Sequence, residues 1–264
     1  MYEPSKASVE VGKGVNRRDP RQTTLFPVSL LFVLTILAQL VSLAFGRIDS
    51  ERSFSDIVLA SLLFLSVLTL PACYFGVVLG RQIGLGVTRL DELFSNNLGA
   101  VQNLKRDVAL AGSMGFFVGG MLLVLRVFTE PFLPPELPQL GYRGVLGGLA
   151  VSLGAAVGEE VWFRLGLMTL LVWSITRLKG NRTPSAAIVW TVIVLSALAF
   201  AAAHLPQLIA YGAGSSVGIV STLLGNVLVG ALYGWLFWQR GIIATMVSHF
   251  SVDLVLHVLS VAVW

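Results

Sequence analysis

Residues 57–79 read IVLASLLFLSVLTLPACYFGVVL, a run without a single charged side chain. A helix needs about 20 consecutive apolar residues to cross a hydrocarbon core of roughly 30 Å, so this run predicts a membrane-spanning helix. Similar runs recur along the chain. Hydrophobic residues make up 55% of the 264 residues and charged residues only 12%, against roughly a quarter charged in soluble domains. The sequence therefore predicts an all-α fold, a polytopic transmembrane helical bundle.

Seven apolar stretches are long enough to span a bilayer. They cover about residues 25–45, 57–79, 108–128, 143–176, 185–203, 217–238 and 242–259. The fourth is the longest, and dividing it would give eight spans. Spaced leucines in residues 81–107 favour an interfacial amphipathic helix between the second and third spans. Four prolines in residues 129–141 predict a break before the fourth stretch.

The ends of the chain and its positive charges indicate an orientation. Residues 1–24 are polar without apolar periodicity, so we expect a disordered cytoplasmic tail and a single membrane domain over residues 25–264. With seven spans, thirteen Lys and Arg residues lie in the segments on the same side of the membrane as the N-terminus, and four lie in the segments on the other side. Because cytoplasmic loops collect positive residues, the N-terminus is predicted inside the cell membrane and the C-terminus opposite. The net charge of +4 then needs no nucleic-acid partner, and the single cysteine, Cys73, excludes an intramolecular disulfide.

Charged and imidazole side chains within the later spans require an explanation, because a charge at a helix centre costs at least about 2.5 to 3.5 kcal/mol on insertion scales. They are Glu159, Glu160, Arg164, His204, His249 and Asp253. Glu160 and Arg164 are four residues apart on a helix and can neutralise each other, as a structural pair or as part of a site. Glu159 is rotated away from them, which leaves a carboxylate suited to act as a general base.

Residues from two further helices could meet this carboxylate. His249 and Asp253 are four apart and project from one face of the last span. His204 stands at the end of its own span, before Leu205 and Pro206. If the helices pack together, these groups form a polar cavity for a water nucleophile. His257, near the end of the last span, is more simply an interfacial or hydrogen-bonded histidine.

The depths of these residues conflict if every span has standard length. With a rise of 1.5 Å per residue, Glu159 lies roughly 24 Å along the fourth stretch from Arg143, whereas His204 is at the outer end of its span. We therefore expect tilted or displaced helices, or a break near residues 154–158.

Three motifs resemble those of the CPBP family of intramembrane metalloproteases, also called the Abi family. This family comprises type II CAAX prenyl endopeptidases and bacteriocin-processing or self-immunity proteins. Residues 159–164 (EEVWFR) match its EExxxR motif, residues 200–204 (FAAAH) its FxxxH motif, and residues 249–253 (HFSVD) its HxxxN/D motif. The resemblance covers a catalytic core at about residues 143–260. It departs at Asp253, where the prenyl endopeptidases typically carry asparagine, and at Leu165, where glycine is common.

The resemblance implies an intramembrane endopeptidase acting on a membrane-associated peptide or lipidated protein, of the prenylated CAAX type or another. Glu159 would activate the attacking water, His204 and His249 would hold the water or stabilise the oxyanion, and Asp253 would complete the site. Glu160 and Arg164 would support it, or Arg164 would hold a substrate carboxylate.

Two questions stay open at this stage. Imidazoles and carboxylates form a legitimate zinc set, so Glu159, His204, His249 and Asp253 are candidate Zn²⁺ ligands, beside an equally consistent metal-free route. The same residues also fit a non-enzymatic bacteriocin-immunity or membrane scaffold protein, or a proton or ion pathway.

Overall fold

The structure is a computed structural model that describes residues 20–46, 54–94 and 99–263. The predicted tail falls outside these ranges up to residue 19. The long helices are α1 (Pro20–Phe45), α2 (Phe54–Ile83), α4 (Ala100–Thr129), α5 (Gly144–Glu159), α6 (Thr169–Leu178), α7 (Ala186–Ala203), α9 (Ser216–Arg240) and α10 (Ile242–Asp253). Shorter elements are α3 (Thr88–Phe94), α8 (Leu205–Ala210), the π-helical η2 (Glu160–Met168) and η3 (Leu254–Val258), and the 3₁₀ turns η1 (Glu130–Phe132) and η4 (Leu259–Ala262).

Seven helical stretches in the described residues are long and apolar enough to cross a membrane, which confirms the predicted bundle. Their outer faces carry large apolar side chains with little protein around them. Phe64, Val67, Phe117 and Phe128 are each 68 to 75% exposed. Such surfaces are unfavourable in water over so wide an area but match the hydrocarbon interior of a bilayer. The chain is therefore a multi-pass membrane protein.

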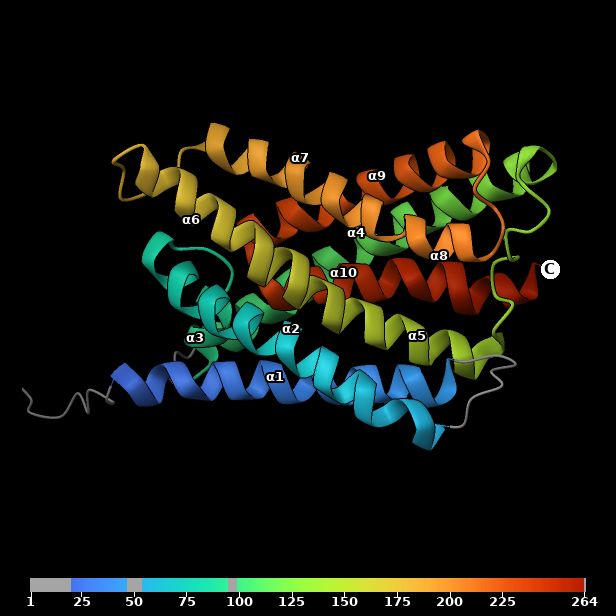
Figure 1. The fold of residues 1–264 in the computed structure, drawn as a ribbon. Helices are drawn as coiled ribbons and strands as arrows, with labels where there is room; N and C mark the ends of the chain where they lie inside the picture. Colours follow the sequence, from blue (N-terminus) through green and yellow to red (C-terminus); the bar gives the residue numbers. More distant parts are fainter. Residues whose placement is uncertain (1–19, 47–53, 95–98, 264) are drawn as a thin grey trace, which may run out of the picture.

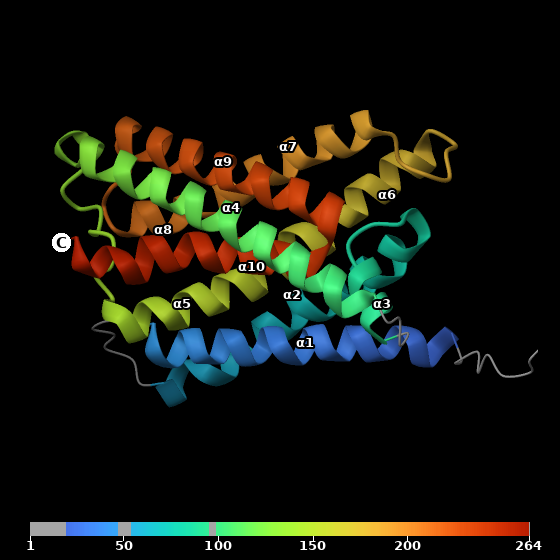
Figure 2. The same ribbon diagram turned by 180° about the vertical axis from the view of Figure 1, so that it is seen from behind.

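Helix α10 occupies the middle of the bundle, with its continuation η3 (Figures 1 and 2). It packs against α4, α5 and α9, and α7 packs along α9. Helices α1 and α2 pack together on the outer side of α5, η2 and α6. Glycines permit the closest approaches, because Gly115 and Gly119 of α4 face the backbone of α10 without room for a side chain. This packing surrounds α10 with the elements that carry the other predicted site residues.

The predicted interfacial helix over residues 81–107 is wrong in extent. Helix α2 continues to Ile83, only the short α3 follows, and α4 begins at Ala100, eight residues before the predicted start. The chain turns at Gly84 and Gly86, whose φ angles are +70° and +86°, values that glycine adopts without strain. Leu85 is buried against the main apolar core rather than lying on the membrane surface.

Ion pairs also attach the segment after α2 to the bundle. Asp107, 3% exposed, accepts ion pairs from Arg89 at 2.8 Å and from Arg240 at 2.9 Å. These contacts join α3, α4 and the end of α9. The side chain of Glu92 adds a second acid to Arg89, and these contacts help raise the pKa of this arginine. Arg89 and Arg240, at this end of the bundle, are thus paired with the buried carboxylate of Asp107.

The long fourth span does not break at residues 154–158. α5, η2 and α6 follow one another as a continuous helical stretch from Gly144 to Leu178. Gly154 and Gly158 serve another purpose, since a side chain at either position would collide with α1. Gln39 of α1 also donates a hydrogen bond of 2.7 Å to the Gly154 carbonyl. The glycines therefore bring α1 and α5 into contact, and the irregularity in the helix occurs later, at Glu160.

Candidate active site

A π-helical segment positions the two adjacent glutamates. The α-helical geometry of α5 ends at Glu159, and η2 runs from Glu160 to Met168. The wider turn interrupts the regular i to i+4 hydrogen bonds; the Thr169 hydroxyl contacts the Arg164 carbonyl at 3.2 Å. π-helical turns are rare and frequently occur at functional sites. Here the change of geometry separates Glu160, which is fully buried, from Glu159, whose side chain is 24% exposed.

Glu160 is the centre of a closed network inside the bundle. One carboxylate oxygen accepts a hydrogen bond of 2.7 Å from Nδ1 of His249. The other lies 3.3 Å from Nε of Arg164, which confirms the ion pair predicted from their spacing. Arg164 donates a further hydrogen bond of 3.1 Å to the Gly230 carbonyl of α9. Because neither Glu160 nor Arg164 has any exposed surface, the proposed contact between Arg164 and a substrate carboxylate does not fit this arrangement.

His249 lies between the two glutamates. Its Nδ1 is engaged by Glu160, and its Nε2 lies 3.8 Å from Glu159 and 3.5 Å from Asp253. The Asp253 side chain is 12% exposed and comes from the same face of α10, as the four-residue spacing predicts. Three carboxylates from two helices therefore converge on one imidazole.

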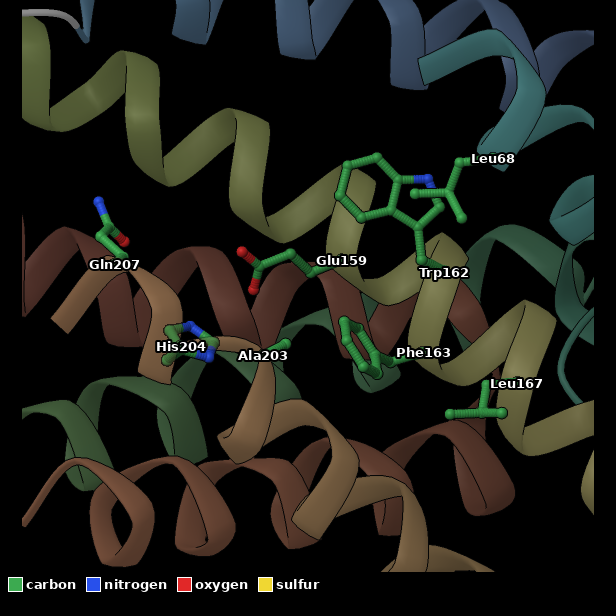
Figure 3. Close-up of a pocket in the computed structure, with 8 residues that line it drawn as sticks. All are labelled: Leu68, Glu159, Trp162, Phe163, Leu167, Ala203, His204 and Gln207. Carbon is green, nitrogen blue, oxygen red and sulfur yellow. The ribbon is translucent and has the colours of Figure 1, made fainter. Parts of the chain in front are cut away.

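His204 approaches Glu159 from α7. The helix ends at Ala203, and the chain continues directly into α8 with Pro206 in its first turn. Nδ1 of His204 lies 2.8 Å from the Phe200 carbonyl. Because a carbonyl oxygen can only accept, this nitrogen carries the proton and Nε2 is left for the cavity. Figure 3 shows the Glu159 carboxylate and the His204 ring lining the same pocket from different helices.

The length of the fourth span resolves the expected conflict of depth. Glu159 lies nineteen residues before Leu178 and His204 eighteen residues after Ala186, and these helix ends are joined by the 179–185 loop. At 1.5 Å per residue, both side chains are roughly 27 to 29 Å from that loop. The difference in depth expected from the sequence assumed a fourth span of ordinary length, whereas this span covers 35 residues.

Two aromatic residues of the site were not predicted. The Tyr233 ring of α9 stacks on His249, with ring centroids 4.5 Å apart and planes 16° apart. Phe200 packs edge-on against His204 and His249, and the Arg164 guanidinium lies 4.5 Å above its ring. Phe200 belongs to the FxxxH motif, but nothing in the apolar sequence around Tyr233 distinguishes it. These ring contacts position the imidazoles of His204 and His249 beside the carboxylates of the site.

Two cavities meet at Glu159 and His204. The smaller, of about 470 Å³, extends toward α2 and is lined by Leu68, Trp162 and their neighbours (Figure 3). The larger, of about 960 Å³, extends toward the ends of α4 and α9 and also contains Tyr233, His249 and Asp253. Leucine and valine are the residue types that occur most often in its walls. His257, predicted to be an interfacial or hydrogen-bonded histidine, lines this cavity.

A bound metal ion finds no preformed group of ligands. Within residues 20–46, 54–94 and 99–263, no three His, Cys, Asp or Glu side chains are arranged to hold one. His249 and His204 use Nδ1 for Glu160 and for a backbone carbonyl, an arrangement that leaves Nε2 of each ring directed elsewhere and is also usual for metal-binding histidines. The zinc set remains a prediction.

Comparison with known families agrees with the motifs. Residues 142–255 match the family described as type II CAAX prenyl endopeptidase Rce1-like, which confirms the resemblance and implies intramembrane proteolysis. All six residues singled out within the spans lie in the matched region. No curated protein and no solved structure matches the chain.

Proposed function

We propose that this chain, whose residues 142–255 form an Rce1-like CAAX endopeptidase domain, cleaves a peptide bond of a membrane-associated substrate by glutamate-activated water. One observation carries the proposal. Glu159 has a carboxylate oxygen without a hydrogen-bond partner among the described residues, in a cavity that it shares with His204 and His249. A free carboxylate beside two imidazoles is a suitable base for a water molecule.

The reaction follows from the positions of these groups. Glu159 removes a proton from water, and the resulting hydroxide adds to the carbonyl carbon of the scissile bond. The carbonyl electrons move to its oxygen, which becomes an oxyanion. When the carbon–nitrogen bond breaks, the departing amine takes the proton from Glu159. His204 and His249 orient the water and the protonated glutamate, and Glu160 holds His249 in its orientation.

The larger cavity supports a substrate attached to lipid. Its walls come from α4, α9 and the segment after η1, and they are lined by side chains such as Leu125, Phe132 and Leu224. These three residues are also 54 to 76% exposed on the lipid-facing surface. An apolar chain, such as a prenyl group of a CAAX-type substrate, can lie along this surface with the peptide bond at Glu159.

The predicted orientation places the end of this cavity that is lined by residues 132–143 on the outer side. The segment 133–143 and α8 lie at the end of the bundle opposite the 179–185 loop (Figure 1). The Lys and Arg bias assigns that loop to the cytoplasm. We therefore propose that the substrate reaches Glu159 from the extracytoplasmic half of the bilayer.

Cleavage of a panel of fluorogenic peptides, prenylated and unprenylated, tests the proposal in detergent. Wild type should cleave a member of the panel, and Glu159→Gln and His249→Ala should not. Glu136→Gln, an exposed glutamate in the loop before α5, is the matched control and should cleave normally. Cleavage by Glu159→Gln at the wild-type rate would contradict the proposed mechanism. An inert wild type with a Glu159-dependent proton flux in proteoliposomes would favour a proton pathway; an inert wild type without flux would favour the scaffold.

A further inference from the structure

Glu159 and Tyr233 both line the larger cavity, and each carries a buried polar atom without a hydrogen-bond partner. Among the described residues, buried side-chain atoms without a hydrogen-bond partner occur on Glu159, Glu160, Arg164, Tyr233, Arg240 and Ser248. Only Glu159 and Tyr233 also line the cavity. One presents a carboxylate oxygen, an acceptor, and the other a phenolic hydroxyl, a donor. Buried polar groups are nearly always hydrogen-bonded, so an unpartnered hydroxyl on a residue that lines a cavity calls for a ligand.

The imidazoles cannot fill the role of neutral donor in this arrangement. His204 donates from Nδ1 to the Phe200 carbonyl, and His249 donates from Nδ1 to Glu160. A neutral imidazole has one N–H, so Nε2 of His204 is an acceptor. Nε2 of His249 lies 3.8 Å from Glu159 and 3.5 Å from Asp253, so any proton on it is directed to a carboxylate. Glu159 and Asp253 are acceptors as well when ionised. The centre of the site is therefore rich in acceptors, although an oxyanion requires donors.

The Tyr233 ring is held by contacts with two neighbouring side chains. His249 stacks on it with the planes 16° apart, and the Arg164 guanidinium lies 5.3 Å from its centroid. Arg164 is itself bound to the carbonyl of Gly230, one turn earlier on α9. With the ring clamped, the direction of its hydroxyl is fixed before substrate binds. A preorganised donor stabilises developing charge without first having to reorient.

We propose that the Tyr233 hydroxyl donates the hydrogen bond that stabilises the oxyanion formed from the scissile carbonyl. The inference rests on the proposed hydrolysis. When hydroxide adds to the carbonyl carbon, the electron pair moves to the carbonyl oxygen, and the phenol donates to that oxygen while keeping its own proton. The bond is lost again when the carbonyl re-forms and the amine departs. Tyr233 is thus a catalytic residue that neither gains nor loses a proton.

Tyr233→Phe tests the proposal, because it removes only the hydroxyl and keeps the stacked ring. We expect kcat to fall about 100-fold, as for other oxyanion donors, with KM nearly unchanged. Melting temperature should not fall, because the deleted hydroxyl has no protein partner. Tyr142→Phe is the matched control. Its hydroxyl contacts Tyr211 at 2.8 Å outside the cavity, and burial raises its pKa to about 12, so it too is a neutral phenol.

A thioamide substrate provides a second readout that a structural role would not affect. Sulfur accepts hydrogen bonds weakly, so replacing the scissile carbonyl oxygen with sulfur should slow wild type more than Tyr233→Phe. Equal kcat in wild type and Tyr233→Phe, or an identical thio effect in both, would overturn the proposal while leaving the hydrolase intact. A lower kcat with a lowered melting temperature and an unchanged thio effect would assign Tyr233 a structural role. If wild type cleaves nothing, the proposed function fails, and this inference fails with it.

Discussion

Glu159 and Glu160 are neighbours in the chain, and the structure predicts different effects on stability for the same substitution. Glu160→Gln removes a negative charge that is wholly buried between Arg164 and His249. Glu159→Gln changes a carboxylate that is partly exposed and has an unpartnered oxygen. We expect Glu160→Gln to lose both stability and activity. Glu159→Gln should lose activity alone.

The size of the effect follows from the buried ion pair. Breaking such a pair by removing one partner costs about 3 to 5 kcal/mol, because the remaining charge is uncompensated. Glutamine keeps an oxygen that can accept from the His249 imidazole, which retains about 1 kcal/mol. The net loss for Glu160→Gln is therefore about 3 kcal/mol. With a shift of roughly 2 to 4 °C per kcal/mol for larger domains, the melting temperature should fall by about 6 to 12 °C.

Thermal unfolding of detergent-purified protein, followed by tryptophan fluorescence, measures this shift. Arg164→Met should be destabilising to a similar degree because it leaves Glu160 without its guanidinium. The double variant Glu160→Gln, Arg164→Met removes both charges and should be more stable than the sum of the single changes predicts. A melting temperature for Glu160→Gln equal to that of wild type would refute the assignment of a buried, coupled pair.

Two further predictions concern metal dependence and orientation. A strong chelator should leave the cleavage rate unchanged, because the proposed route activates water with the Glu159 carboxylate alone; loss of cleavage that Zn²⁺ restores would contradict this route. In a Cys73→Ser background, Asn181→Cys should be inaccessible to an impermeant thiol reagent in intact cells, and Gln139→Cys should be accessible. The reverse labelling pattern would place the end of the cavity that is lined by residues 132–143 in the cytoplasm.

The existence of the spans could be predicted because hydrophobic runs of sufficient length report directly on the membrane. Their packing could not. The glycines at 154 and 158 suggested a weak point in a helix, but they mark where α1 approaches α5. A sequence shows that a residue lacks a side chain and does not show which neighbour uses the space.

The candidate site was predictable where spacing along one helix determines proximity. Glu160 with Arg164 and His249 with Asp253 are such pairs, and the structure brings both pairs together. The contact between Glu160 and His249 spans 89 positions, so it depends on how η2 and α10 pack. Tyr233 escaped prediction for the same reason, since its role depends on a ring stacked across two helices.

Substitution of Asp253 tests whether the many hydrogen-bond acceptors of the site oppose the formation of an oxyanion. Its carboxylate lies 3.5 Å from Nε2 of His249, where the prenyl endopeptidases resembled by this chain typically carry asparagine. A carboxylate near the scissile carbonyl opposes the formation of an oxyanion, whereas an amide supplies an N–H donor. Asp253→Asn should therefore retain cleavage and restore part of the rate lost in Tyr233→Phe. Loss of all cleavage in Asp253→Asn would instead show that the negative charge itself is needed, as it would be for a base or a metal ligand.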